Sequence, residues 1–120
     1  MRILIVDDHI LFREGLSGLL RSQPDTVVVG ECGTVAEAVD LAARLKPDVV
    51  LMDFSLPDGT GLDATGAILA EEPQTQVIFL TVHDNDERLV SAIRAGAKGY
   101  LLKNLSVSKL LASLRALERG

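Results

Sequence analysis

The stretch LMDFSLPDG, residues 51–59, ends a run of apolar residues with a carboxylate, Asp53, which a proline and other turn formers soon follow. A second stretch, ILIVDDH at residues 3–9, ends in the same way with Asp7 and Asp8. Nearly continuous apolar runs of this length are typical of parallel strands that are covered on both faces. The two stretches therefore predict buried strands that each end in carboxylates.

Short runs rich in β-branched residues alternate with longer helical patterns along the whole chain. We expect strands at residues 2–6, 26–31, 48–52, 76–80 and 99–102. Apolar residues at helical spacing lie between or after them, for example Phe12, Leu16, Leu19 and Leu20, or Val107, Leu110, Leu111, Leu114 and Leu117. This alternation predicts parallel strands joined by right-handed crossovers, with helices on both faces of one sheet.

The predicted fold class is therefore α/β, a doubly wound five-stranded parallel sheet of the flavodoxin-like kind. The strand order 2-1-3-4-5 is inferred from that fold class. Helix starts are predicted by three pairs of residues with capping-box spacing, which are Thr34 with Glu37, Thr60 with Asp63, and Asp84 with Glu87.

Composition narrows the class of protein. A length of 120 residues predicts one domain, residues 1–120, and 48% hydrophobic but only 3% aromatic residues predict an aliphatic core. The only cysteine, Cys32, excludes a disulfide within the chain and is expected to be structural or exposed. A net charge of −5 without a basic block argues against direct nucleic-acid binding. No apolar stretch approaches the ~20 residues of a membrane span.

Polar residues directly follow four of the predicted strands. They are Asp7 and Asp8 after the first strand, Asp53 after the third, Thr81 after the fourth and Lys103 after the fifth. Ligands of such sheets bind beyond the carboxyl ends of the strands, so we expect these side chains to lie together. Three carboxylates repel one another unless a cation compensates, and Mg²⁺ suits a site of this kind. A carboxylate beside Mg²⁺ can act as the nucleophile in phosphoryl transfer.

These residues, in this order, resemble the signature of the response-regulator receiver domain of two-component signalling. The resemblance extends from residue 2 to about residue 118. The stretches VDDH, residues 6–9, and TVHDND, residues 81–86, resemble the NarL/FixJ-type subgroup, whose bacterial members carry a helix-turn-helix DNA-binding domain after the receiver.

The resemblance implies a role for each carboxylate. Asp53 would be the phosphoacceptor and would also bind Mg²⁺. Asp8 would be a second direct Mg²⁺ ligand, and the backbone carbonyl of Ser55 a third. Asp7 would act on the metal mostly through a bound water.

It also implies how a phosphoryl group is read. Lys103 would pair with the phosphoryl group, and Thr81 would move to hydrogen-bond it. Tyr100 would change rotamer together with Thr81. Many receivers have a proline after this lysine, joined by a cis peptide, whereas this chain has Asn104. The geometry of that bond is therefore open, because a cis peptide before a non-proline residue is costly.

The implied function is a phosphorylation-controlled switch in the bacterial cytoplasm, with no enzymatic activity beyond self-phosphorylation and autodephosphorylation. A sensor histidine kinase would supply the phosphoryl group. The response would appear around residues 81–105 and on the faces of the last two helices, and the last helix with Leu105 is the expected patch for a homodimer. The output would be control of transcription through a C-terminal DNA-binding domain absent from this chain. We expect no membrane partner.

Other interpretations compete with the receiver. Asp7, Asp8 and Asp53 could be helix caps or turn residues. A phosphohydrolase of the haloacid-dehalogenase kind would need D-x-D spacing after the first strand, which DDHI lacks. A flavodoxin-like FMN protein would need a first loop that can hold a phosphate, and this loop is acidic. A receiver-like protein that binds partners without phosphorylation is disfavoured by the intact Asp53, Thr81 and Lys103. We expect His9 to open the first helix and not to bind metal.

Overall fold

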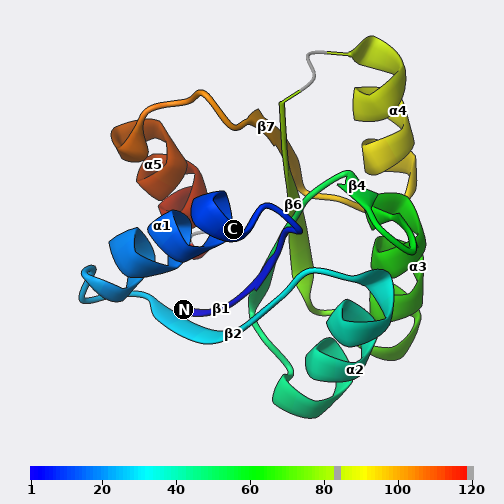
Figure 1. Cartoon of the computed structure of the whole chain (residues 1–120), viewed down its shortest axis with the longest axis horizontal. Helices are drawn as coiled ribbons and strands as arrows, with labels where there is room; N and C mark the ends of the chain where they lie inside the picture. The colour runs from blue at the N-terminus through cyan, green and yellow to red at the C-terminus, as the bar shows by residue number, and fades with distance from the viewer. Residues whose placement is uncertain (83–84, 119–120) are drawn as a thin grey trace.

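The computed structural model describes residues 1–82 and 85–118. It contains a central parallel sheet with helices on both faces (Figure 1). Its five strands are β1 (Arg2–Val6), β2 (Val27–Cys32), β3 (Val49–Met52), β6 (Gln76–Thr81) and β7 (Gly99–Leu102). They pair in the order β2-β1-β3-β6-β7. Strands β4 (Ser55–Leu56) and β5 (Gly59–Thr60) form a separate, small antiparallel ribbon. Because this ribbon follows β3 in the chain, the last two strands of the main sheet are numbered β6 and β7. The order 2-1-3-4-5 predicted for the main strands is therefore confirmed.

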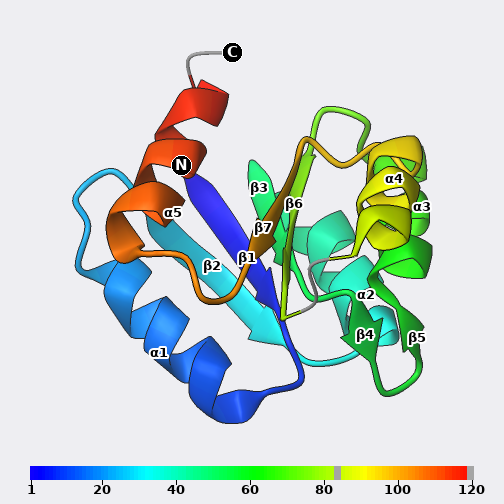
Figure 2. The ribbon, with the colours of Figure 1, turned by 90° about the horizontal axis from the view of Figure 1, so that it is seen from above.

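Five helices cover the two faces of this sheet. They are α1 (Ile10–Arg21), α2 (Val35–Leu45), α3 (Gly61–Glu71), α4 (Asp86–Arg94) and α5 (Val107–Glu118). Helices α1 and α5 lie on one side of the sheet, and α2, α3 and α4 lie on the other, as Figures 1 and 2 show. This is the doubly wound α/β architecture that the alternation of patterns predicts.

The strands are apolar on both faces because each face meets helices. Side chains alternate between the faces along a strand, so Val50 and Met52 of β3 join the core beneath α2, α3 and α4. Their neighbours Val49 and Leu51 join the core beneath α1 and α5. The thiol of Cys32 is buried in the first of these cores, and burial raises its pKa to about 12. Cys32 is therefore structural and not exposed.

Helix starts follow the predicted capping residues where the structure describes them. The Thr60 hydroxyl accepts a hydrogen bond from the backbone of Asp63, whose carboxylate accepts one in return, completing the capping box of α3. The Thr34 hydroxyl accepts from the backbone of Glu37 at the start of α2. Asp84, the predicted cap of α4, lies outside the described residues, and the cap of that helix is Asn85.

Two details of the fold differ from the sequence prediction. The β4–β5 ribbon was not predicted, because a stretch with Pro57, Asp58 and Gly59 is typical of a simple turn. Strand bounds also differ by one residue: β2 runs from Val27 to Cys32, β3 begins at Val49, and β6 includes Thr81 as its last residue. Within residues 1–82 and 85–118, every helix is too short or too polar to cross a membrane.

Candidate functional site

The register of the sheet places the predicted site residues together at the carboxyl ends of the strands, which we call the carboxyl edge of the sheet. Val6 pairs with Met52, so Asp7 and Asp53 follow neighbouring strands at the same level. The ladder continues past the strands, because the Asp53 amide donates to the Val6 carbonyl at 2.9 Å. Similarly, the Lys103 amide donates to the carbonyl of Thr81 at 2.7 Å. Lys103 Nζ lies 3.4 Å from Asp53 Oδ2, and Asp53 and Thr81 line one pocket, so the four strand ends that the sequence singles out are brought together.

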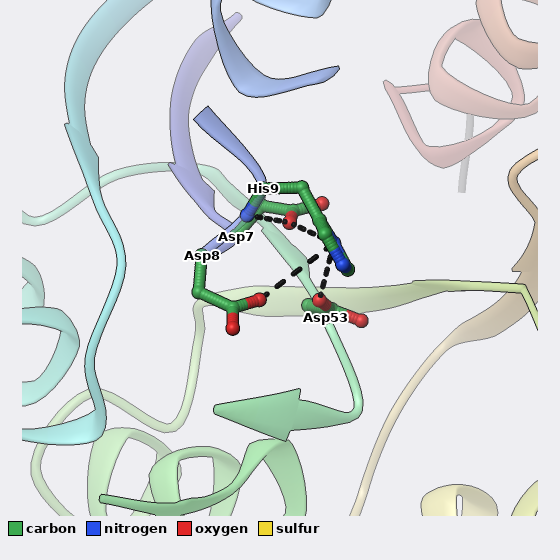
Figure 3. Close-up of side chains that lie close together, drawn as sticks. All are labelled: Asp7, Asp8, His9 and Asp53. Carbon is green, nitrogen blue, oxygen red and sulfur yellow. Dashed lines mark hydrogen bonds and ion pairs between the residues drawn. The ribbon is translucent and has the colours of Figure 1, made fainter. Parts of the chain in front are cut away.

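Three carboxylates and an imidazole form a compact cluster at this edge. Asp7, Asp8, His9 and Asp53 each offer a ligand atom, and these atoms lie within 4.8 Å of one another (Figure 3). Asp7 and Asp53 are buried, with exposed fractions of 2% and 6%, whereas Asp8 is exposed. The cluster therefore has a buried part and a part open to solvent.

Lys103 supplies the nearest positive charge to the cluster. Its ammonium nitrogen lies 2.7 Å from Asp7 Oδ2 and 3.4 Å from Asp53 Oδ2. The same nitrogen lies 4.7 Å from the centroid of the Phe12 ring on α1. One ammonium therefore faces two buried carboxylates, so the net charge of the group stays negative.

His9 belongs to the cluster more closely than the sequence suggested. It is the N-cap residue of α1, as predicted, but its side chain makes no capping bond. Its backbone amide donates to Asp7 Oδ1 at 2.8 Å, and its ring Nδ1 lies 3.1 Å from the same oxygen. Nδ1 also lies 3.1 Å from Lys103 Nζ. Its distance to Asp53 Oδ2 is 3.6 Å (Figure 3). The sequence signal for this contact was the position of His9, two residues after Asp7 in the turn before α1.

Burial and like charge change the acidity of Asp53. Burial, and then the neighbouring charge of Asp7, raise the pKa of the Asp53 carboxyl to about 6, although Lys103 opposes the shift. Asp53 Oδ1 accepts a hydrogen bond from the Phe54 amide at 2.9 Å. A carboxyl whose acidity is perturbed by specific neighbours in a cleft is a candidate for chemistry.

The cluster opens into a small pocket. Its volume is about 240 Å³, and Asp8, Asp53, Ser55 and Thr81 are among the residues that line it. Arg88 of α4 also lines it. Arg88 was not predicted from the sequence, because it follows no strand end and belongs to no motif.

The loop that carries Asp53 depends on a close approach of two backbone segments. The Gly61 amide donates to the Phe54 carbonyl at 2.6 Å. A side chain at Gly61 would clash with the carbonyl of Asp53 and with the ring of Phe79. Glycine at this position therefore lets α3 begin directly behind the acidic loop.

The remaining predicted residues have these positions. Ser55 opens β4 and lines the pocket. Tyr100 lies half-buried on β7, where its ring stacks on Phe79 with 6.4 Å between the centroids. The peptide between Lys103 and Asn104 is trans. His83, two residues after Thr81 in the TVHDND stretch, lies outside the described residues.

Comparison with known proteins agrees with this geometry. Residues 3–115 match the family described as the response regulator receiver domain. The chain belongs to this family. The receiver is 42% identical over 121 residues to the oxygen regulatory protein NreC of Staphylococcus aureus. It is 39% identical over 120 residues to the uncharacterized transcriptional regulatory protein YxjL of Bacillus subtilis. These matches cover 100% of the receiver but 56% and 55% of the two relatives, so it spans just over half of their length.

Solved structures also resemble the receiver. The receiver domain of the response regulator NarL from Mycobacterium tuberculosis superposes with a TM-score of 0.93 at 32% identity, covering 99% of this chain and 96% of that one. A LuxR-family response regulator from Aurantimonas gives a TM-score of 0.91 at 34% identity, covering 97% of this chain and 83% of that one. The receiver is therefore similar to domains of bacterial transcription regulators, and the predicted family and fold are confirmed.

Proposed function

We propose that this receiver is a phosphorylation-controlled switch and that Asp53 accepts the phosphoryl group. The observation that carries the proposal is the position of Asp53, which is buried, lies 3.4 Å from Lys103 Nζ and lines the pocket. With a pKa of about 6, its carboxyl is mostly ionised at neutral pH and can act as a nucleophile.

The proposed chemistry is a single displacement at phosphorus. An oxygen of the Asp53 carboxylate forms a bond to phosphorus, and the bond between phosphorus and the leaving group breaks. The leaving group is the imidazole of a sensor kinase's phosphohistidine, or acetate when acetyl phosphate is the donor. Autodephosphorylation reverses the modification when water displaces the carboxylate. Lys103 and Thr81, at the ends of β7 and β6, would stabilise the charged phosphoryl oxygens.

Mg²⁺ is the metal that this site fits. Its preferred ligands are oxygens from one or two carboxylates, carbonyls and water, and the cluster offers Asp8 and Asp53, with the Ser55 carbonyl as a third proposed ligand. Asp7 is already engaged by Lys103 and His9, which supports an indirect role for it. When bound, Mg²⁺ supplies positive charge that offsets the carboxylates and the phosphoryl oxygens.

The proposed partners and location follow from the family. A sensor histidine kinase in the bacterial cytoplasm would be the donor. Thr81, with Tyr100, would report phosphorylation to the surface of α4, β7 and α5. YxjL is named as a transcriptional regulatory protein, and the LuxR-family neighbour is named as a response regulator. These names support control of transcription as the output, through a DNA-binding domain outside this chain.

Self-association is the proposed consequence of phosphorylation. A groove of about 270 Å³ between α1 and α5 is lined by apolar side chains, including Leu11, Leu105 and Val107. Leu11 has an exposed fraction of 86%. Lys103 also borders this groove, so its movement toward a phosphoryl group would change one wall of it. We propose that a second copy of the chain covers this groove.

Mass spectrometry of the intact protein tests the phosphoacceptor. Incubation with acetyl phosphate and Mg²⁺ is expected to add one phosphoryl mass to the wild type. Asp53→Asn should remove most of that addition, because an amide is a poor nucleophile. Asp40→Asn is the matched control, since it makes the same change at an exposed carboxylate on α2. Equal labelling of Asp53→Asn and Asp40→Asn would refute the assignment.

A further inference from the structure

Arg88 is held beside the phosphoacceptor by contacts on both its backbone and its side chain. It lies in the first turn of α4, where its amide donates to the Asn85 side chain at 3.2 Å. Its guanidinium carbon lies 4.5 Å from the centroid of the Phe54 ring. Phe54 is buried, packs against Phe79 and directly follows Asp53. The stacking therefore holds a cationic group against the residue next to the acceptor.

One nitrogen of this guanidinium lacks an acceptor. Arg88 Nη1 is buried and has no hydrogen-bond partner among the described residues. A buried donor without a partner is costly, so it is rarely left in that condition without a reason. Arg88 lines the same pocket as Asp53 and Thr81, and that pocket is where oxygens added to Asp53 would lie.

We propose that Arg88 is a second cationic ligand of the phosphoryl group on Asp53, an inference that rests on the proposed function. Lys103 is engaged by Asp7 and borders the groove between α1 and α5. Arg88 reaches the pocket from α4, on the opposite face of the sheet (Figure 2). A phosphoryl group on Asp53 adds acceptor oxygens and negative charge, and the guanidinium fork suits such oxygens.

This contact would tie α4 to the phosphoryl group directly. Helix α4 exposes the apolar side chains Leu89, Val90 and Ile93. Because Arg88 precedes them in the same helix, a bond from Arg88 to the phosphoryl group would bias the position of that apolar surface. The receiver would then have a path from Asp53 to α4 besides the one through Thr81.

Two titrations of the intact chain test the role of Arg88. The first measures the affinity for beryllofluoride, a phosphoryl mimic, at saturating Mg²⁺, and the second measures the affinity for Mg²⁺ alone. The test variant is Arg88→Met, which keeps an unbranched apolar chain over Phe54 but removes the charge. The matched control is Arg94→Met, which removes an exposed arginine from the last turn of the same helix. Arg88→Lys retains the charge without the fork.

We expect Arg88→Met to weaken beryllofluoride binding about tenfold, as for the loss of one charged hydrogen bond. Its affinity for Mg²⁺ alone should stay equal or rise, because a competing cation is gone. Arg94→Met should change both affinities about twofold or less, and Arg88→Lys should fall between the wild type and Arg88→Met.

Three outcomes decide between the possibilities. Beryllofluoride binding by Arg88→Met equal to that of Arg94→Met would overturn the inference. Equal weakening of beryllofluoride and Mg²⁺ binding, with a lower melting temperature, would show that Arg88 is structural and would also overturn it. If the wild type is not labelled at Asp53 by acetyl phosphate, the proposed function itself fails. That failure is distinct, because the titrations compare variants in which Asp53 is unchanged.

Discussion

Lys103 and Asp7 form a buried ion pair, with the ammonium nitrogen 2.7 Å from a carboxylate oxygen. The same nitrogen lies 3.4 Å from Asp53, so Lys103 is closer to the carboxylate that we do not expect to react. A phosphoryl group on Asp53 would compete with Asp7 for this ammonium. Phosphorylation of Asp53 would therefore draw Lys103 away from Asp7 and change the charge balance of the carboxylate cluster.

Removing Lys103 should tighten Mg²⁺ binding. Lys103→Met leaves the carboxylates of Asp7, Asp8 and Asp53 without their nearest cation, and the attraction for a divalent ion rises. We expect the Mg²⁺ dissociation constant, measured by titration, to fall by roughly three- to tenfold. The same variant without Mg²⁺ should be destabilised by about 1–3 kcal/mol, because two buried carboxylates lose their partner. Lys98→Met, at an exposed site, is the control; weaker Mg²⁺ binding in Lys103→Met than in this control would contradict the prediction.

The two carboxylates after β1 should differ in their effect on the metal. Asp8→Ala is expected to weaken Mg²⁺ binding more than Asp7→Ala, since Asp8 is exposed to the pocket and Asp7 is engaged by Lys103. In the metal-free protein the two substitutions should have opposite effects on stability. Asp8→Ala relieves repulsion and should raise the melting temperature, whereas Asp7→Ala leaves Lys103 short of a partner and should lower it. Calorimetric titration and thermal unfolding measure both effects; identical behaviour of the two variants would argue against separate roles.

The raised pKa of Asp53 predicts a pH-dependent cost in the metal-free protein. The folded carboxyl holds its proton up to about pH 6, whereas the ordinary pKa of the group is 3.8, so the unfolded chain releases its proton first as pH rises. The contribution of Asp53 to stability should therefore fall as the pH rises from about 4 to about 6. Asp53→Asn should raise the free energy of unfolding by roughly 1–3 kcal/mol above pH 6 and lose that advantage below pH 4. Urea unfolding across this range measures the difference, and a constant difference at all pH values would contradict it.

Thr81 should matter more for the response than for the chemistry. Its side chain is buried at the end of β6 and lines the pocket, so it can contact a phosphoryl group without attacking phosphorus. Thr81→Ala is expected to retain most labelling by acetyl phosphate but to lose most of the dimer formed with beryllofluoride. Sedimentation of both proteins tests this. An unchanged monomer–dimer equilibrium in the wild type would leave phosphorylation standing and refute dimerisation of this chain as the output.

Two exposed apolar surfaces compete for the dimer interface. One lies at α1 and α5 around Leu11, and the other lies on α4 around Ile93. We expect Leu11→Glu to abolish the dimer formed with beryllofluoride, because the charge would be buried when a second copy covers the groove. Ile93→Glu makes the same kind of change on α4 and should leave the dimer largely intact. Sedimentation distinguishes the two surfaces, and the reverse result would place the interface on α4.

The sequence by itself determined the fold class and the last residues of β1, β3 and β7. Apolar runs such as ILIV and VVLM are long enough to be buried but too short for core helices, so their alternation with helical patterns admits few topologies. The carboxyl ends of parallel strands meet at one edge, so the positions of Asp7, Asp53, Thr81 and Lys103 along the chain are enough to place them together. Strand bounds moved by a residue because pairing, rather than composition, decides where a strand ends.

Only the tertiary structure decided which charges meet. Arg88 and Asp53 are far apart in sequence, and their shared pocket arises because the first turn of α4 packs over Phe54. The approach of the His9 ring to Lys103 and Asp53 likewise depends on the strand order β1-β3-β6-β7, which brings the ends of β1, β3 and β7 to one end of the sheet. The raised pKa of Asp53 follows from burial beneath other elements and from the charge of Asp7, which is far from Asp53 in the sequence. Periodicity reports which face of an element is apolar, but the side-chain contacts between elements come from packing.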